Sequence, residues 1–339
     1  MPAVPLPWPL ETPDGWEPPR LHAVPMFCHF KKAISTSPLA GRGWAFQERA
    51  LSARDLHLTS ELGHWECKEA CIGEDMDAEL MDSYNVQDGF WHLKEMLLAD
   101  QGSSEISALT LHDHWAWVIE ELSKRSFTIT KDKFPALSGV AQMFAAKQAL
   151  GTYLCGLWEN EFHRHLLWSC IRDGPIKTSH RRSVDASAPT WSWASIDGPV
   201  RNPAINRATH SSTEGFRLLY ELGSEGLLTH KILSIESISC EREGRAALFG
   251  SVIKAEIKAS GILKPVKRGK RVRDSTFEIE RLTGEAVGLG SWDIDQDQCD
   301  RERKQLWVCP VMQCKELVQG LCTSECLLLE SVARSPLTS

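Results

Sequence analysis

The chain has 339 residues, of which 42% are hydrophobic and 24% charged, and its formal net charge is −7 at pH 7. This balance is typical of a soluble globular protein and provides no general attraction to nucleic acid or to anionic membranes. Proline recurs through the N-terminus, and no run approaches the roughly 18 apolar residues that span a bilayer, so neither a signal peptide nor a membrane segment is predicted. The eleven dispersed cysteines favour reduced thiols, and the sequence predicts a cytoplasmic location.

The first predicted segment, residues 1–41, is a proline-rich arm. Proline fixes φ and removes a backbone donor, so neither a helix nor a central strand is expected there. From residue 42 onward Trp44 and Leu51 fit a short helix. Leu56 and Leu58 then fit an extended segment, with a break at Ser52 between the two.

Helical periodicity continues further along the chain. Leu111, Trp115, Val118 and Leu122 form a clear apolar stripe. Pro135 stands where the first residue of a helix would, and an apolar face follows it. The predicted helices are placed within 82–100, over 111–122, from 135 to before Gly151, and around Trp158, Phe162 and Leu166.

Beyond these helices the pattern becomes that of strands. Trp191 and Trp193 alternate with small polar residues in PTWSWAS, which in a strand places both indoles on one face. The segment 198–215 is rich in Pro, Asn, Gly and Ser and marks an internal boundary. Residues 253–259 alternate between apolar and charged, as in a half-buried strand. The predicted fold class is α+β, with a Trp-rich, mainly helical region at 42–200, a linker at 201–215 and a β-rich C-terminal region at 216–335.

Candidate metal sites are weak. His64, Cys67 and Cys71 have spacings that zinc could use, and Cys28 with His29 could add ligands, but the second pair is irregularly placed. Buried cysteine is the commoner use of such residues, so no metal is predicted. The aspartates of WDIDQDQCD resemble a calcium loop but lack its glycine and its final glutamate, which predicts a solvated acidic loop.

Other functional motifs are missing or ambiguous. The sequence contains no G-x-S-x-G elbow, phosphate loop or dinucleotide fingerprint, so no cofactor and no catalytic residue is predicted. The pairs His112/His114 and His163/His165 lie two residues apart on predicted helices, which turns the two rings of each pair to different faces. The basic cluster KPVKRGKRVR has no interleaved aromatic residues and is interpreted as a charged hairpin connection rather than a nucleic-acid site.

One stretch carries a family resemblance. RGWAFQERALSARDLHLTSELGHWEC, from Arg42 to Cys67, resembles the closing segment of the fungal heterokaryon-incompatibility (HET) domain, in which members read approximately R-x-W-x-x-Q-E-R-x-L-S-x-R-x-L-H followed by W-E-C. Segments 132–141, 153–168 and 189–200 resemble downstream parts of the same family, with a weaker similarity over 249–263. The family-motif positions are Arg42, Trp44, Gln47, Glu48, Arg49, His57, Trp65, Glu66, Cys67, Trp158, Trp168, Trp191 and Trp193.

The resemblance also implies what this sequence lacks. Two upstream family segments, which resemble Y-x-x-L-S-Y-x-W-G and W-I-D-x-x-C-I-x-Q, are not found in it. The chain is thus similar to a family member without most of its N-terminal domain. The family is linked to self/non-self recognition and cell death, and a TIR-like, NAD-cleaving site would belong to the absent part. The expected function is a non-catalytic scaffold or interaction portion with an unidentified protein partner.

This hypothesis predicts where the residues of the first motif lie in the structure. Trp44 and Trp65 would be core residues, while Arg42, Glu48 and Arg49 would form a polar seam toward the partner domain. Apolar surface would be exposed near residues 42–66, because loss of a packing layer uncovers the face beneath it. Two alternatives stay open. One is a TIR-like nucleotide (NAD) hydrolase that uses Glu48 in a pocket with a raised carboxyl pKa, and the other is a zinc-stabilised binding module.

Overall fold

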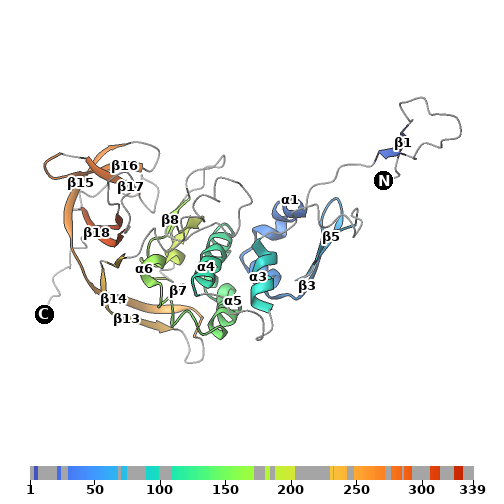
Figure 1. The fold of residues 1–339 in the computed structure, drawn as a ribbon, viewed down its shortest axis with the longest axis horizontal. Coiled ribbons are helices and arrows are strands. Elements are labelled where there is room, and N and C mark those ends of the chain that lie inside the picture. Colours follow the sequence, from blue (N-terminus) through green and yellow to red (C-terminus); the bar gives the residue numbers. More distant parts are fainter. Residues whose placement is uncertain are drawn as a thin grey trace.

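The computed structural model describes residues 4–6, 21–23, 30–67, 70–74, 89–98, 108–171, 180–183, 188–202, 230–231, 233–242, 248–271, 276–284, 286–291, 306–313 and 324–330. The fold is α+β, with a Trp-rich, mainly helical body up to residue 202 and a β-rich C-terminal region from residue 230. Figure 1 places helices in the middle, a small sheet beyond them on one side and the C-terminal strands on the other. Among the described helices, none combines the length and the apolar character needed to cross a bilayer.

The helices confirm most of the predicted periodicity. They are α1 (Phe30–Ser35), α2 (Gly43–Leu51), α3 (Gly89–Leu98), α4 (Ala108–Ser123), α5 (Pro135–Ala146) and α6 (Phe162–His165), with 3-10 turns η1 (Pro38–Gly41), η3 (Thr130–Lys133) and η4 (Trp193–Ser195). In α4 the stripe from Leu111 to Leu122 is buried, and α5 starts with Pro135 in its first turn as predicted. The prediction for 82–100 is confirmed over α3, and its remaining residues lie outside the described part of the chain.

The chain up to residue 202 also contains short antiparallel strands. They are β1 (Val4–Leu6), β2 (Leu21–Ala23), β3 (Arg54–Leu58), β4 (Gly63–Cys67), β5 (Cys71–Gly73), β6 (Tyr153–Leu154), β7 (Leu157–Trp158), β8 (Ser169–Cys170), β9 (Arg181–Arg182), β10 (Ile196–Asp197) and β11 (Val200–Arg201). The largest sheet has the order β3-β4-β5, and the remaining strands form four two-stranded pairs, β1-β2, β6-β7, β8-β11 and β9-β10. The break predicted at Ser52 is confirmed, since Ser52 ends α2 just before β3.

The C-terminal region is built from longer strands, β12 (His230–Lys231), β13 (Ser234–Arg242), β14 (Val252–Ser260), β15 (Lys264–Arg271), β16 (Thr276–Arg281), β17 (Ala286–Ser291), β18 (Leu306–Gln313) and β19 (Ser324–Glu330). One sheet runs β12-β18-β15-β16-β17, with β19 also paired to β18, and β13 pairs with β14. The strand predicted at 253–259 is confirmed as β14. A register shift near Ile253 leaves Val252 buried and Ile253 exposed, which departs from simple alternation.

Several predictions were wrong. The first 41 residues include α1, because no proline interrupts residues 26–37 and Phe30 and Ile34 can pack on one face of a turn. The internal boundary predicted at 198–215 starts too early, because Val200 is buried and pairs with Cys170. Residues 203–215 lie outside the described part of the chain. The basic cluster is not a hairpin connection but the strand β15, with Val266 buried between the exposed Pro265 and Lys267.

The Trp-rich segments were also mispredicted. Trp158 belongs to a hairpin and not to a helix, because Cys155 (φ 51) and Gly156 (φ 89) both adopt left-handed conformations that turn the chain. PTWSWAS forms turns instead of a strand, and its last three residues, Trp193–Ser195, are the 3-10 turn η4. The hydroxyl of Ser192 accepts from the amide of Ala194 and donates to the carbonyl of Cys155, and such local side-chain bonds compete with strand pairing.

The aromatic core of the body is organised around Gly156. Its carbonyl oxygen accepts hydrogen bonds from the indole Nε1 of Trp115 at 3.0 Å and of Trp193 at 3.3 Å. Trp115 packs edge-on against Phe144 and Trp158, with ring centroids 5.1 and 5.3 Å apart. One backbone carbonyl therefore satisfies two buried indoles that would otherwise lose their hydrogen bonds to water.

Replacing Gly156 with alanine should strongly destabilise the protein. A Cβ at this position would lie 2.5 Å from Nε1 of Trp193, and the positive φ disfavours any side chain. We expect Gly156→Ala to lower the free energy of unfolding by roughly 2–4 kcal/mol in denaturant titrations. The matched control is Gly41→Ala, where a Cβ meets nothing within 4 Å and the change should stay within about 0.5 kcal/mol. Equal effects of the two substitutions would contradict this account.

Candidate functional site

The sheet of β3, β4 and β5 has two faces of different chemistry. Successive strand residues point to opposite faces, so Asp55, His57 and Glu66 lie toward the helices, whereas Leu56 and Trp65 lie on the outer side. Leu56 and Trp65 are direct cross-strand partners, as are Asp55 and Glu66. The inner face carries an ion network, and the outer face carries exposed apolar side chains.

Glu66 is the centre of the ion network. Its Oε2 accepts hydrogen bonds from Nε of Arg49 at 2.8 Å and from Nε2 of His57 at 2.7 Å. Nζ of Lys94 lies 3.2 Å from Oε1 of Glu66 and 2.5 Å from Oδ2 of Asp55. The side chains of Glu66 and Lys94 are both 0% exposed. Residues from β3, β4, α2 and α3 thus meet at one buried carboxylate.

The pKa of Glu66 shows that the network more than compensates for its burial. Burial alone would raise the pKa of this carboxyl, but the hydrogen bond from His57 and the charges of Arg49 and Lys94 outweigh that effect. The result is a pKa lowered to about 2, so Glu66 is ionised over the whole physiological range. The guanidinium of Arg49 also lies 4.0 Å from the ring centroid of Phe90, a cation–π contact that adds to its interaction with Glu66.

Sequence reasoning identified only part of this network. Arg49, His57 and Glu66 were singled out by the family resemblance, but Asp55 and Lys94 were not. The available signal for Lys94 was its place on the apolar face of α3, next to the buried Leu93 and Leu97. A lysine on such a face is rarely buried unless a carboxylate pairs with it.

The outer face of the sheet is exposed. Leu56 is 65%, Leu58 81% and Trp65 38% exposed, and Trp44 on α2 is 42% exposed. The expectation of exposed apolar surface near residues 42–66 is confirmed. The expectation that Trp44 and Trp65 are core residues is wrong, because β4 turns Trp65 outward and Trp44 is 42% exposed, with its indole N–H donating to Oδ2 of Asp132 at 3.0 Å.

The other motif residues of α2 have distinct positions. The side-chain oxygen of Gln47 accepts from the backbone N–H of Gly139 on α5 at 2.7 Å, which joins the two helices. The backbone of Arg42 pairs with Ser126, whereas its side chain is exposed. Glu48 is exposed and does not join the Glu66 network. The predicted polar seam of Arg42, Glu48 and Arg49 is therefore divided, with only Arg49 turned inward.

The downstream motif residues belong to the core and not to this site. Trp158 and Trp193 are buried, and the half-buried Trp168 donates its indole N–H to the carbonyl oxygen of Trp191 at 2.8 Å. Trp191 in turn packs against Phe162, with ring centroids 5.7 Å apart. These four tryptophans stabilise the body, and the structure does not bring them to Glu66 or to the outer face of the sheet.

The structure does not bring together the zinc ligands that the sequence suggested. His64 and Cys71 face the inner side of the sheet, whereas Cys67 points to the outer side, so these three cannot bind one ion. Cys28 and His29 lie outside the described residues, as does the acidic loop at 292–300.

A different set has ligand atoms close enough for a metal ion, namely Asp55, His57 and Glu66. The ammonium of Lys94 already lies between the two carboxylates, at 2.5 Å and 3.2 Å from their oxygens. Together with Arg49 it balances their negative charge. An added cation would have to displace Lys94, so the arrangement is that of an ion network and not of a metal site.

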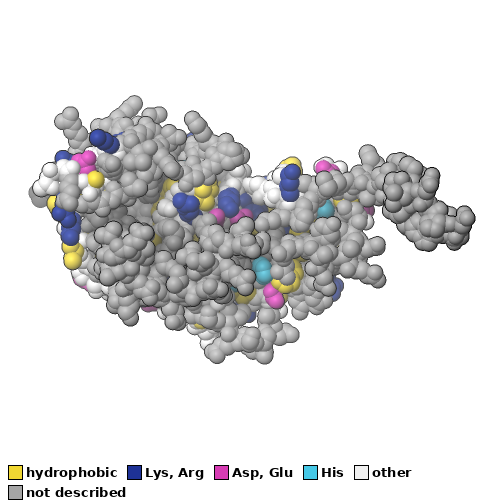
Figure 2. All heavy atoms as spheres, turned by 45° about the horizontal axis from the view of Figure 1, so that its top comes forward, with side chains coloured by type: hydrophobic (Ala, Val, Ile, Leu, Met, Phe, Trp, Pro, Cys, Tyr) yellow, Lys and Arg dark blue, Asp and Glu magenta, His cyan; other side chains and the backbone are white. Residues whose placement is uncertain are grey.

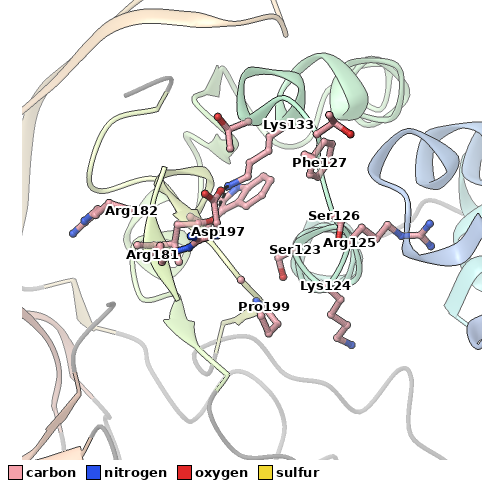
Figure 3. Close-up of a pocket in the computed structure, with 15 residues that line it drawn as sticks. Ser123, Lys124, Arg125, Ser126, Phe127, Lys133, Arg181, Arg182, Asp197 and Pro199 are labelled. Atoms are coloured by element: carbon pink, nitrogen blue, oxygen red, sulfur yellow. Dashed lines mark hydrogen bonds and ion pairs between the residues drawn. The ribbon is translucent and has the colours of Figure 1, made fainter. Parts of the chain in front are cut away.

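A cavity of about 570 Å³ lies between the end of α4 and the turn from η4 to β11. Its central cation, Lys133, donates to the carbonyls of Ala194 at 3.0 Å and Ile196 at 2.7 Å, and to Oδ1 of Asp197 at 2.7 Å. Figure 3 shows Lys124 pointing away from this centre. Burial lowers the pKa of Lys133, and the bond to Asp197 partly offsets that effect. Lys133 thus anchors the turn and has no remaining donor for a ligand.

Lysine and arginine side chains are dispersed on the surface drawn in Figure 2. Those of the described residues occur at several separate places on this face, interspersed with acidic and hydrophobic side chains. On the described part of this face, positive charge therefore does not form a single block of the kind that tracks a nucleic-acid backbone.

Two histidines that were assigned to separate pairs contact each other. Nδ1 of His112 on α4 lies 2.9 Å from Nε2 of His165 on α6, and both rings are buried. Burial, followed by the charges of Arg164 and Lys231, lowers the pKa of His112 to about 4. Burial and the neighbouring His112 lower the pKa of His165 as well. Both rings are neutral at pH 7, which makes this contact sensitive to acid.

Comparisons with protein-family models, with curated proteins and with solved structures give no match for this chain. The geometry itself defines an α+β protein in which a buried ion network supports one face of a small sheet and leaves an apolar strip on the other face.

Neutralising Glu66 should destabilise the protein strongly. Glu66→Gln would leave Arg49 and Lys94 without their shared carboxylate inside the protein, and we expect the free energy of unfolding to fall by about 3 kcal/mol or more. Glu48→Gln makes the same chemical change at an exposed position and should cost less than about 0.5 kcal/mol. Denaturant titration of both variants checks this expectation, and a small effect of Glu66→Gln would show that the network is not important for stability.

Mild acid should destabilise the folded protein through the histidine contact. The folded pKa of His112 is about 4 and its ordinary value is 6.5, so between these values the unfolded chain binds a proton that the folded protein does not. Stability therefore falls as the pH decreases from 6.5, by about 2 kcal/mol at pH 5 from His112 alone. Glu66 contributes little in this window, because the stability that its lowered pKa provides is lost mainly below pH 4.5.

The measurement is the free energy of unfolding at pH 7 and at pH 5 for the wild type and for a His112→Gln, His165→Gln double variant. The double variant should lose less stability than the wild type on acidification. The difference should be at least the contribution of His112, about 2 kcal/mol. An unchanged loss would show that other groups produce the acid sensitivity.

Proposed function

We propose that this chain is a non-catalytic interaction portion of a heterokaryon-incompatibility-type protein, and that the outer face of β3, β4 and β5 binds a protein partner. One observation carries the proposal. The motif that resembles this family builds a sheet whose inner face is closed by the Glu66 network, while Leu56, Leu58 and Trp65 remain in solvent on the other face.

The composition of this face suits a protein partner. In a two-sided antiparallel sheet the solvent face is ordinarily polar, so adjacent exposed leucine and tryptophan side chains indicate a surface that is covered in the working assembly. Trp65 lies directly opposite Leu56, which gives the centre of the patch a large aromatic group of the kind enriched at binding hot spots. Arg54 is exposed on the same face and can pair with an acidic group at the rim.

The structure of the network also suits a docking role. Binding is more favourable when the surface is already in its bound conformation, because fewer groups are ordered on association. Glu66, Arg49 and Lys94 tie β4 to α2 and α3 from behind, so the sheet does not depend on a partner to stay in place. The fungal origin, the self/non-self recognition and the link to cell death belong to the proposal through the family resemblance.

The nucleotide-hydrolase alternative has no comparable support. It requires Glu48 in a pocket with converging donors, whereas Glu48 is exposed on α2 and does not line the described cavity. The zinc-module alternative requires His64 and Cys67 to bind the same ion, but they lie on opposite faces of the sheet. Neither alternative is carried by a specific contact among the described residues.

The test supplies the expected partner in trans. A heterokaryon-incompatibility domain that contains the two upstream motifs is titrated into this chain, and binding is followed by calorimetry. We expect Leu56→Asp to weaken binding at least tenfold, since it places a charge in the apolar centre. Leu248→Asp is the matched control, because Leu248 is also 65% exposed but lies away from the sheet, and it should bind like the wild type.

The same variants can be expressed in a filamentous fungus together with that domain, with hyphal viability as the readout. The proposal expects death with the wild type and with Leu248→Asp, and survival with Leu56→Asp. Absence of binding by the wild-type chain, or equal binding by all three proteins, would refute it.

A further inference from the structure

Two cysteines far apart in the sequence meet where the body contacts the C-terminal region. Sγ of Cys155, in the turn between β6 and β7, lies 2.9 Å from Sγ of Cys240 on β13. They are 85 residues apart in the chain, so local structure does not account for the contact. Both are thiols that form no disulfide in the structure.

The position of Cys155 is rigid and unusual. It has a φ of 51°, in the first position of a two-residue turn that ordinarily favours asparagine, aspartate or glycine. The turn is held by the core, because the hydroxyl of Ser192 donates to the carbonyl of Cys155 at 2.7 Å and two indoles donate to the carbonyl of Gly156. The backbone geometry therefore gives no reason for a cysteine here, and the neighbouring thiol does.

The two thiols have different surroundings. Cys155 is fully buried, whereas Cys240 is only half-buried. Arg242, two residues along the same strand, donates to the carbonyl of Tyr153 at 2.5 Å and lies with its guanidinium 5.7 Å from the Tyr153 ring centroid. The hydrogen bond from the S–H of Cys155 and the charge of Arg242 lower the pKa of Cys240. The hydrogen bond to Cys240 and burial raise the pKa of Cys155.

We propose that Cys155 and Cys240 form a dithiol site that a hydroperoxide oxidises to a disulfide, which links the Trp-rich body covalently to the C-terminal β-rich region. The less buried Cys240 is the attacking group, and the fully buried Cys155 is the resolving group. This proposal does not rest on the docking face or on the family resemblance, because neither thiol belongs to β3, β4 or β5.

The reaction balances with hydrogen peroxide as the oxidant. The thiolate of Cys240 attacks one peroxide oxygen, the O–O bond breaks, and hydroxide leaves and takes up a proton to become water, which gives a sulfenic acid on Cys240. The sulfur of Cys155 then attacks the Cys240 sulfur, the S–O bond breaks, and the departing hydroxide takes the Cys155 proton as a second water. Two thiols are oxidised by two electrons, and one peroxide is reduced to two waters.

The geometry favours the second step. The sulfurs must approach from 2.9 Å to a bond length of about 2.05 Å, a movement small enough for side-chain rotation. The resulting disulfide would close a long loop, which restricts the unfolded chain and raises the midpoint of thermal unfolding, on the order of 5 °C for a chain of this size.

The experiment uses the full chain, reduced and then freed of reductant, with a small molar excess of hydrogen peroxide. Free thiols are alkylated and peptides are mapped by mass spectrometry. We expect a peptide pair joined through Cys155 and Cys240 that has lost two hydrogen atoms, and a raised unfolding midpoint that returns to its starting value on reduction. Cys240→Ala should abolish both effects, and Cys170→Ser, a substitution at another half-buried thiol, should leave both unchanged.

A second variant separates the two roles. In Cys155→Ser the attacking thiol has no resolving partner, so Cys240 should accumulate as a sulfenic acid that dimedone labels, and circular dichroism confirms that the variant is folded. The proposal is overturned if peroxide leaves Cys155 and Cys240 unlinked in the wild type while it oxidises Cys67 or Cys170. It is equally overturned if the linked pair forms without any change in the unfolding midpoint.

Discussion

The placement of one buried carboxylate organises this end of the molecule. An ionised glutamate inside a protein is costly unless cations and hydrogen bonds replace the lost water. Glu66 on β4 meets this requirement with Arg49 from α2, His57 from β3 and Lys94 from α3, so three elements besides its own strand must be in place together. Satisfying the charge thereby fixes how the sheet lies against the helices.

The same constraint explains why the sheet can have one exposed apolar face. In a small sheet the usual source of stability is apolar burial on at least one side. Here the inner side combines the ion network with the packing of Phe30 against the rings of His57 and His64, at centroid distances of 6.1 and 5.6 Å. Leu56, Leu58 and Trp65 remain exposed on the outer face.

At the other end of the body, the turn at Cys155 and Gly156 has a comparable central position. The Gly156 carbonyl joins Trp115 to Trp193, and the thiol one residue earlier reaches β13 in the C-terminal region. The turn thus belongs both to the aromatic core and to the contact between the two parts of the chain. A chemical change at its sulfur would therefore act directly on the connection between these two parts.

The sequence by itself determined the α+β class, the helices with sustained apolar stripes and the strand β14, because period and end signals are local properties that packing reinforced. It also located Arg49, His57 and Glu66 through a motif. Only the tertiary structure decided that Lys94 and Asp55 complete the network, that Trp44 and Trp65 face solvent, that PTWSWAS is a turn, and that His112 meets His165. Each of these depends on groups distant in the chain or on which face of a strand is covered, and a local pattern does not specify either.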